Sequence, residues 1–306
     1  MSETRLIVNG DDFGMSRGIT DGIVLAHRYG FLTSASLMAN MPAAEYAIAR
    51  MASVPNLGVG VHLNICSGRP ILPPDKVPTL VDAGGDFHPP AMMIRKLWTW
   101  RAAGREIEAE FRAQIQWMKD RGAVPTHADS HHHMHIYPAA VIPFSRALAA
   151  EGIRCARAPR SSVWPANGGI GGPHEGSPVR RLCVQTYRAG VQRIAFRTLD
   201  MPASRISFLS RDRHDPAALG ERWKAAIANL PAGTFELACH PGLFERGFSE
   251  ADRIHDQREQ ELHWLTDREW IDVVHSSGVR LITYRDLSET PAAEPAAAEA
   301  EAHALQ

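Results

Sequence analysis

The sequence lacks the features that define several large protein classes. Its 306 residues include four cysteines, Cys66, Cys155, Cys183 and Cys239, and no C-x-x-C pair, which excludes zinc-ribbon and thioredoxin-type sites. So few cysteines fit free thiols in a reducing compartment. No run approaches the ~20 apolar residues of a membrane-spanning helix, and the opening MSETRLIVNGDDFG has no signal-peptide pattern. We therefore expect a cytoplasmic protein with no transmembrane span.

A strong charge of either sign is also absent. The chain has 33 Lys and Arg against 34 Asp and Glu, for a formal net charge of −1. This balance gives no reason to expect a nucleic-acid partner. Internal repeats of solenoid length are absent as well. The residue in excess is histidine, with 15 copies that are not spread evenly along the chain.

Short β-rich runs alternate with longer amphipathic patterns, which predicts an α/β fold with a parallel sheet. Seven runs are expected to be strands: residues 5–9, 34–38, 57–62, 125–129, 153–158, 234–239 and 279–283. Helical spacing of apolar residues predicts helices at 19–29, 106–121, 140–151, 215–229 and 267–277. Trp117, Trp223 and Trp270 lie inside these helices, so we expect them in the core.

We expect a single barrel domain over residues 1–288. Two stretches interrupt the alternation: a proline-rich excursion at 66–103 and a segment rich in Gly, Pro and Ser at 160–178. Long loops in a compact domain are often lids or substrate grips, although tolerated insertions explain them equally well. Residues 289–306 are an Ala/Glu-rich tail, which we expect to be disordered.

Four polar clusters each follow a predicted strand directly. They are NGDDFG at 9–14, GVHLN at 60–64, THADSHHHMH at 126–135 and ACHPG at 238–242. The C-terminal ends of all strands in a parallel barrel open on one face, and active sites lie there. We therefore expect the clusters to converge on one site at the C-terminal ends of about seven strands.

Asp11 and Asp12 are adjacent carboxylates after an apolar strand. Two neighbouring carboxylates repel each other when both are ionised, and a metal ion bound to one removes the conflict and leaves the other as a base. The alternative is that an aspartate caps the helix that begins near Ser16. His62 ends the next apolar run, where it is either a ligand or a hydrogen-bonded core residue, and Asn64 would orient it or touch substrate.

The His-rich cluster carries five histidines and one aspartate in ten residues. Imidazole is the commonest metal ligand, and a His/His/carboxylate set suits zinc or a similar ion. An extended segment would turn His131, His133 and His135 to one side. A helical segment would place His131 and His135 on one face. A polar patch without metal is the remaining alternative.

Together the four clusters resemble those of the YdjC-type carbohydrate deacetylases, which include chitooligosaccharide deacetylases. The resemblance runs from about residue 5 to about residue 287. It implies a distorted (β/α) barrel and one divalent metal ion, zinc or magnesium, bound by Asp12, His62 and His131. It also implies that Asp11 is the catalytic base and that His240 protonates the leaving amine.

The implied reaction removes an acetyl group from the nitrogen of an amino sugar. Asp129 is expected to hydrogen-bond a ligand imidazole, and His133 and His135 to lie around the metal or the substrate. Trp164, in the Gly-rich segment, would stack on a sugar ring or anchor its loop.

The loop SGRPILPPDKVPTLVDAGGDFHPP is similar to the hopanoid-biosynthesis branch of the family. The sequence has Gly10 where the family usually has alanine, and DSHHHMHIY where that branch has a pattern such as AHKHMHLH. A sugar-bearing glycolipid substrate would favour an apolar groove near Trp98 and Trp100 and transient contact with a membrane surface. Core packing explains that apolar segment equally well.

Two other functions compete with deacetylation. A hydrolase of another ester or phosphoester would usually need two metals and more carboxylate ligands. A non-catalytic metal- or sugar-binding protein would need neither a base beside the ligand aspartate nor His240. A homodimer is compatible with the sequence.

Overall fold

The central strand of the sheet, β1 (Thr4–Phe13), is hydrogen-bonded to three neighbours. This computed structural model describes residues 3–159, 178–207, 216–248, 252 and 254–287. The segment at 160–177, with Trp164, and the tail at 289–306 therefore lie outside the described residues.

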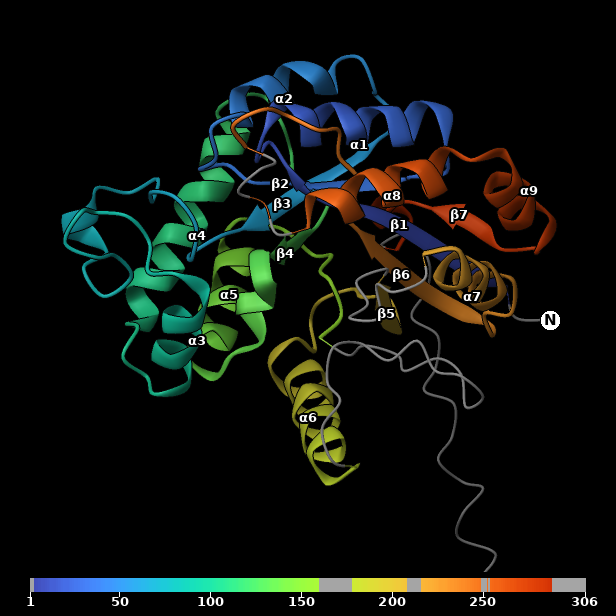
Figure 1. Ribbon diagram of the computed structural model, residues 1–306. Helices are drawn as coiled ribbons and strands as arrows, with labels where there is room; N and C mark the ends of the chain where they lie inside the picture. The colour runs from blue at the N-terminus through green and yellow to red at the C-terminus, as the bar shows by residue number, and fades with distance from the viewer. Residues whose placement is uncertain (1–2, 160–177, 208–215, 249–251, 253, 288–306) are drawn as a thin grey trace, which may run out of the picture.

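Every strand pairing in the sheet is parallel, and the strand order is β4-β3-β2-β1-β6-β5, with β7 also on β1. The curled sheet and the helices around it form the predicted distorted barrel (Figure 1). The strands after β1 are β2 (Ser34–Leu37), β3 (Gly58–Leu63), β4 (Ala128–Ser130), β5 (Ser204–Ser207), β6 (Gly233–Cys239) and β7 (Arg280–Ile282).

Strand β1 is apolar at Leu6, Ile7 and Val8, all of which are fully buried. A strand buried on both faces is a continuous apolar run, as expected inside a parallel sheet. The same strand continues through Asp11 and Asp12, so its buried apolar part anchors a polar end.

One of the seven predicted strands is wrong. Residues 153–158 make only isolated parallel bridges, Ala128 with Ala156 and Cys155 with Asp200. The strand that the prediction missed is β5, where Ile206 is the one apolar residue among serines and an arginine. No apolar run marks such a strand, because its pairing with β6 and not its own side chains specifies it.

The helices that cover the sheet are α1 (Arg17–Tyr29), α2 (Ala44–Met51), α3 (Pro90–Trp98), α4 (Gly104–Lys119), α5 (Pro138–Ala150), α6 (Pro178–Gly190), α7 (Pro216–Ala228), α8 (His255–Thr266) and α9 (Arg268–Ser276). The five predicted helices correspond to α1, α4, α5, α7 and α9. Helix α3 lies inside the predicted 66–103 excursion, where proline at its first position begins the helix rather than breaking it.

Of the three helical tryptophans, Trp223 and Trp270 are buried, as predicted. Trp117 is only partly buried, and the Arg121 guanidinium lies 3.8 Å from its ring centroid. No helix in the described part of the chain is long and apolar enough to cross a membrane.

Helix α1 approaches the segment after β6 at Gly22. A Cβ atom added there would lie 2.5 Å from the Gly242 Cα atom, closer than real contacts allow. Alanine normally favours a helix over glycine by about 1 kcal/mol. We predict that Gly22→Ala nevertheless lowers the free energy of unfolding by about 1–3 kcal/mol, because overpacking dominates.

Urea denaturation checks this prediction, with Gly190→Ala as the matched control. Gly190 has helical dihedrals, φ −61° and ψ −46°, and its added Cβ would meet nothing within 4 Å. The control should be unchanged or slightly more stable. A Gly22→Ala protein as stable as the control would contradict the close approach of the two segments.

Candidate metal and catalytic site

The polar clusters meet where the strands of the sheet end. Asp12 lies near the end of β1 and His62 near the end of β3. His131 follows β4 directly, and His240 follows β6. Parallel pairing of β1 with β6 and of β3 with β4 brings these strand ends to the same face of the barrel.

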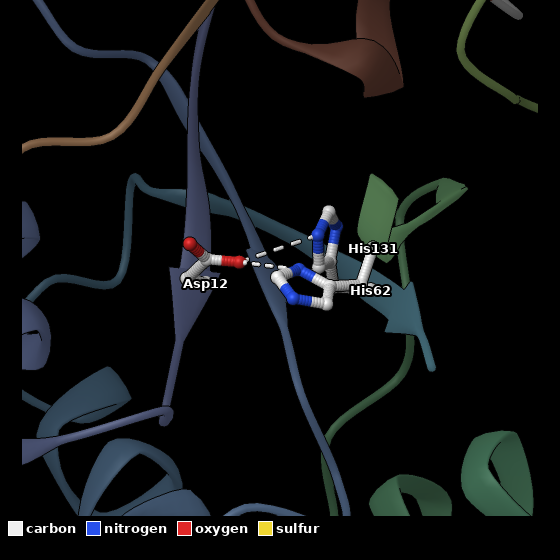
Figure 2. Close-up of side chains that lie close together, drawn as sticks. All are labelled: Asp12, His62 and His131. Atoms are coloured by element: carbon white, nitrogen blue, oxygen red, sulfur yellow. Dashed lines mark ion pairs between the residues drawn. The ribbon is translucent and has the colours of Figure 1, made fainter. Parts of the chain in front are cut away.

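Three side chains form a group with the spacing of metal ligands. The Asp12 Oδ1 atom lies 3.4 Å from His62 Nε2 and 3.0 Å from His131 Nδ1. Figure 2 shows the three side chains facing one another. Asp12 Oδ1 is buried but accepts no hydrogen bond, which is unusual for a carboxylate oxygen. A carboxylate and two imidazoles converging around such an oxygen fit a divalent cation.

The backbone of Asp12 has a conformation that an aspartate seldom adopts. Its φ is 68°, in the left-handed region, and the pairing of β1 with β2 changes register between Gly10 and Phe13. This irregularity separates the directions of Asp11 and Asp12. The helix cap considered for them is wrong, because the Ser16 hydroxyl accepts the hydrogen bond of the Ile19 N–H.

The second ring nitrogen of His62 is held by a buried carboxylate. His62 Nδ1 lies 2.7 Å from Asp129 Oδ1, and the Ser36 hydroxyl donates to the other Asp129 oxygen. This contact points His62 Nε2 at Asp12. Burial opposes protonation of His62, but Asp129 and the other nearby carboxylates raise its pKa to about 9. A cation bound at Nε2 would displace that proton.

The second oxygen of Asp12 is held by Arg258, from α8. Arg258 Nη2 donates to Asp12 Oδ2 at 2.7 Å, and Asp252 in turn accepts from Arg258 Nε. Although burial alone would raise the Asp12 pKa, Arg258 and the two histidines hold it well below its ordinary value. Arg258 lies 246 positions from Asp12, and no sequence pattern marked it.

Arg157 is the cation at the centre of a second cluster. Its guanidinium makes two hydrogen bonds to Asp11, at 2.7 and 2.6 Å, and also contacts Asp129 and Glu236. Burial raises the Asp11 pKa, and Arg157 more than offsets this, so the net shift is downward. Residues 153–158 also contain Arg154, so the sequence pattern did not single out Arg157.

Asp11, His62 and Asp129 also have the spacing of metal ligands. Arg157 already supplies a cation to both carboxylates of that group. This group is therefore a weaker candidate for a metal ion than the Asp12–His62–His131 group.

His240 lies between two carboxylates. Its Nε2 atom is 3.7 Å from Asp11 Oδ2, and its backbone N–H donates to the buried Glu261 of α8. Burial lowers the His240 pKa to about 4 and raises the Glu261 pKa to about 7. The ring is thus neutral at neutral pH. Neither this protonation state nor the contact with Glu261 was predictable from the sequence pattern.

The His-rich segment is neither the strand nor the regular helix considered for it. It forms a 3-10 segment, η2 (His131–Ile136), with His132 and His133 at left-handed φ values of 51° and 54°. The rings consequently point in different directions. His133 pairs with Arg205, and His135 bonds the Ser130 hydroxyl, so His131 is the one that faces Asp12.

Asn64 holds the loop that follows β3. Its side chain is fully buried, donates to the Ser67 carbonyl and to Asn40, and accepts from the Cys66 N–H. These bonds account for Asn64 without a substrate.

We predict that Arg157→Gln lowers the free energy of unfolding by about 3–5 kcal/mol at pH 7, because it leaves buried carboxylates unpaired. Without Arg157 the folded-state pKa values of these carboxylates rise above the unfolded ones. The folded variant then binds protons more readily, and its deficit should shrink as the pH falls from 7 to 5.

Urea denaturation at both pH values tests this, with Arg146→Gln as the control. Arg146 is exposed and lies 4.0 Å from Glu108, so its loss should have little effect. Equal effects of the two substitutions would show that the Arg157 cluster does not stabilise the fold.

Comparison with known proteins agrees with this fold. Residues 5–276 match the family model described as YdjC-like protein. A carbohydrate deacetylase of Geobacillus stearothermophilus is 34% identical over 281 residues, which cover 92% of this chain and 96% of the relative. A chitooligosaccharide deacetylase of Proteus mirabilis is 37% identical over 139 residues, 43% of this chain and 50% of the relative.

Among solved structures, one from Enterococcus faecalis V583, described as a candidate cellobiose-phosphate cleavage protein, has a TM-score of 0.74. The match covers 94% of this chain and 99% of that one at 24% identity, and it shows a shared fold. With the family model spanning most of the barrel and the polar clusters gathered at its strand ends, the chain belongs to the YdjC-like protein family.

Proposed function

We propose that the chain is a metal-dependent carbohydrate deacetylase that hydrolyses the N-acetyl group of an amino sugar. The observation that carries the proposal is the adjacency of two groups. The Asp12–His62–His131 set has the spacing of metal ligands, and the neighbouring Asp11 faces His240. The names of the related carbohydrate deacetylases support the substrate class.

Asp12, His62 and His131 would hold the metal ion. When bound, a divalent cation supplies a Lewis acid and lowers the pKa of the attacking water. Two imidazoles and one carboxylate favour zinc over magnesium, since magnesium prefers oxygen ligands. Asp129 would orient His62, and Arg258 would orient Asp12, each through a hydrogen bond to the ligand atom that does not face the metal.

Asp11 would accept the proton of the attacking water. Arg157 keeps the Asp11 pKa low and fixes the carboxylate plane through two hydrogen bonds. A further bond from Asn9, at 2.9 Å, limits rotation of the carboxylate. Asp11 is therefore ionised and oriented before substrate arrives, as a general base must be.

His240 would deliver a proton to the departing amine. Because the ring is neutral at neutral pH, it must first gain that proton, and Asp11 Oδ2 is 3.7 Å from its Nε2 atom. We infer that the proton accepted by Asp11 passes to His240. The Glu261 carboxyl, 3.9 Å from Nδ1, would stabilise the transient imidazolium.

The N-acetylated sugar could be attached either to a lipid or to further sugar units. The loop at 67–90 is similar to the hopanoid-biosynthesis branch, so an acetylglucosaminyl lipid is the glycolipid to test beside chitooligosaccharides. Mass spectrometry of acetate and amine products from both substrates decides between them.

We predict that Asp11→Asn retains the metal but loses about 100-fold to 10,000-fold in kcat/KM, the range for removal of a general base. Metal content by mass spectrometry and acetate release from an N-acetylated chitooligosaccharide measure the two effects. Turnover at the wild-type rate would show that Asp11 is not the base. Loss of the metal as well would show that it is a ligand.

We predict that His62→Ala loses stoichiometric metal, because it removes a ligand. Asp129→Asn should keep the metal but bind it about 10-fold to 100-fold more weakly, the usual effect of losing a partner of a ligand histidine. Titration of the metal-free proteins with zinc measures both. His263→Ala, on the exposed side of α8, is the control, and full occupancy in His62→Ala would remove His62 from the ligand set.

A further inference from the structure

Exposed apolar side chains gather on one group of neighbouring elements. Nine large hydrophobic residues are exposed in the described part of the chain, and five of them lie close together in the fold. They belong to α3 and the residues just after it, to α5, and to the π-helical segment η3 (Val191–Ala195). They are Met92, Trp98, Trp100, Ile142 and Ile194, with exposed fractions of 42%, 51%, 69%, 47% and 77%. We call this set the α3–η3 surface.

Side-chain contacts join the elements of the α3–η3 surface. The Trp98 ring lies 5.9 Å, centroid to centroid, from Tyr137 at the start of α5 and the same distance from Tyr187 of α6. The Ser145 hydroxyl of α5 donates to the Ala195 carbonyl of η3. Helices α3, α5 and α6 lie together at the lower side of the molecule in Figure 1. The elements that carry the exposed apolar residues therefore pack together, and clustered exposed apolar residues mark an interaction site.

The same surface is strongly cationic, although the chain as a whole is not. Residues 87–105 contain Arg95, Lys96, Arg101 and Arg105 and no carboxylate, and residues 183–199 contain three arginines and no carboxylate. Within α4, which follows, Glu106 and Glu110 are buried, and the partly exposed Glu108 lies 4.0 Å from Arg146 of α5. A local concentration of positive charge attracts anionic partners, even in a protein whose net charge is −1.

A cavity of about 270 Å³ adjoins η3. Its lining includes the side chains of Arg193 and Arg197 and the apolar residues Phe196, Leu199 and Met201. Two guanidinium groups above apolar walls suit a ligand with an anionic head and an apolar body.

The position of Trp100 adds a separate observation. It follows α3 with φ at 57°, a conformation that is an outlier for a bulky residue. Strain of this kind persists at functional surfaces. Here it accompanies an indole that is more than two-thirds exposed.

We propose that the α3–η3 surface docks on a membrane surface that carries anionic lipids. Tryptophan rings favour the headgroup level of a bilayer, aliphatic side chains enter the acyl boundary, and each arginine near the surface gains from the lipid charge. Exposed Met92, Ile142 and Ile194 suit a bilayer better than a nucleic acid. The density of cations suits it better than a protein interface, whose core is poor in charge.

Vesicle co-sedimentation of the full chain tests the proposal. Phosphatidylcholine vesicles with about one third phosphatidylglycerol should retain the protein, and pure phosphatidylcholine vesicles should retain much less. High salt should weaken the binding because it screens the charges. Equal retention on both vesicles, or no retention on either, would overturn the proposal, as would binding to duplex DNA in place of vesicles.

Substitutions distinguish binding through the α3–η3 surface from non-specific adsorption to vesicles. Arg193→Gln and Arg197→Gln should each weaken binding about fivefold, and Trp100→Ser should also weaken it. The controls are Arg268→Gln and Val124→Ser, exposed residues outside the surface, which should bind as the wild type does. Equal losses of vesicle binding in the controls and in the surface variants would also contradict the proposal.

The binding assay needs no substrate, so it stands or falls separately from the deacetylase proposal. Deacetylation of a water-soluble chitooligosaccharide should be unchanged in the three surface variants and in both controls.

Discussion

The Arg157 guanidinium is the interaction on which the candidate site depends. It joins carboxylates from three strands: Asp11 on β1, Asp129 at β4 and Glu236 on β6. Buried carboxylates without a cation would repel one another or take up protons. Asp129 in turn fixes His62, and Asp11 faces His240. A single buried cation thus keeps Asp11, the proposed base, ionised and, through Asp129, orients His62, a proposed ligand, so the fold and the candidate site share one electrostatic centre.

Much of this arrangement could be predicted from sequence, because parallel strands bring their ends together. Polar clusters after apolar runs were enough to place the ends of β1, β3, β4 and β6 on one face. Arg157 and Arg258 were not predictable in the same way, since a sequence pattern shows where a side chain lies along its own element and not what it meets. The turn at η2 is a similar case, because its left-handed residues are stabilised by tertiary contacts such as that of His133 with Arg205.

Backbone strain marks the residues whose dihedral angles are set by tertiary contacts and not by local conformational preference. Asp12, Trp100, His132 and His133 are the non-glycine residues with positive φ in the described ranges. Three of them belong to the candidate site and the fourth to the α3–η3 surface. Conformations that cost of order 1–3 kcal/mol each persist only where the surroundings enforce them. Helical and strand periodicity, from which the elements were predicted, carries no information about such positive-φ conformations.

Helix α8 has a consequence for how the site comes into being. It carries Arg258, which holds Asp12, and, one turn later, Glu261, which holds the backbone of His240. The three proposed ligand residues are all synthesised by position 131, yet both supports come from a helix that begins at residue 255. Since the ribosome delivers the chain N-terminus first, a nascent chain would expose His62 and His131 well before Arg258 could hold Asp12 in place. The supported geometry of Asp12 and His240 is therefore complete only after α8 has left the ribosome.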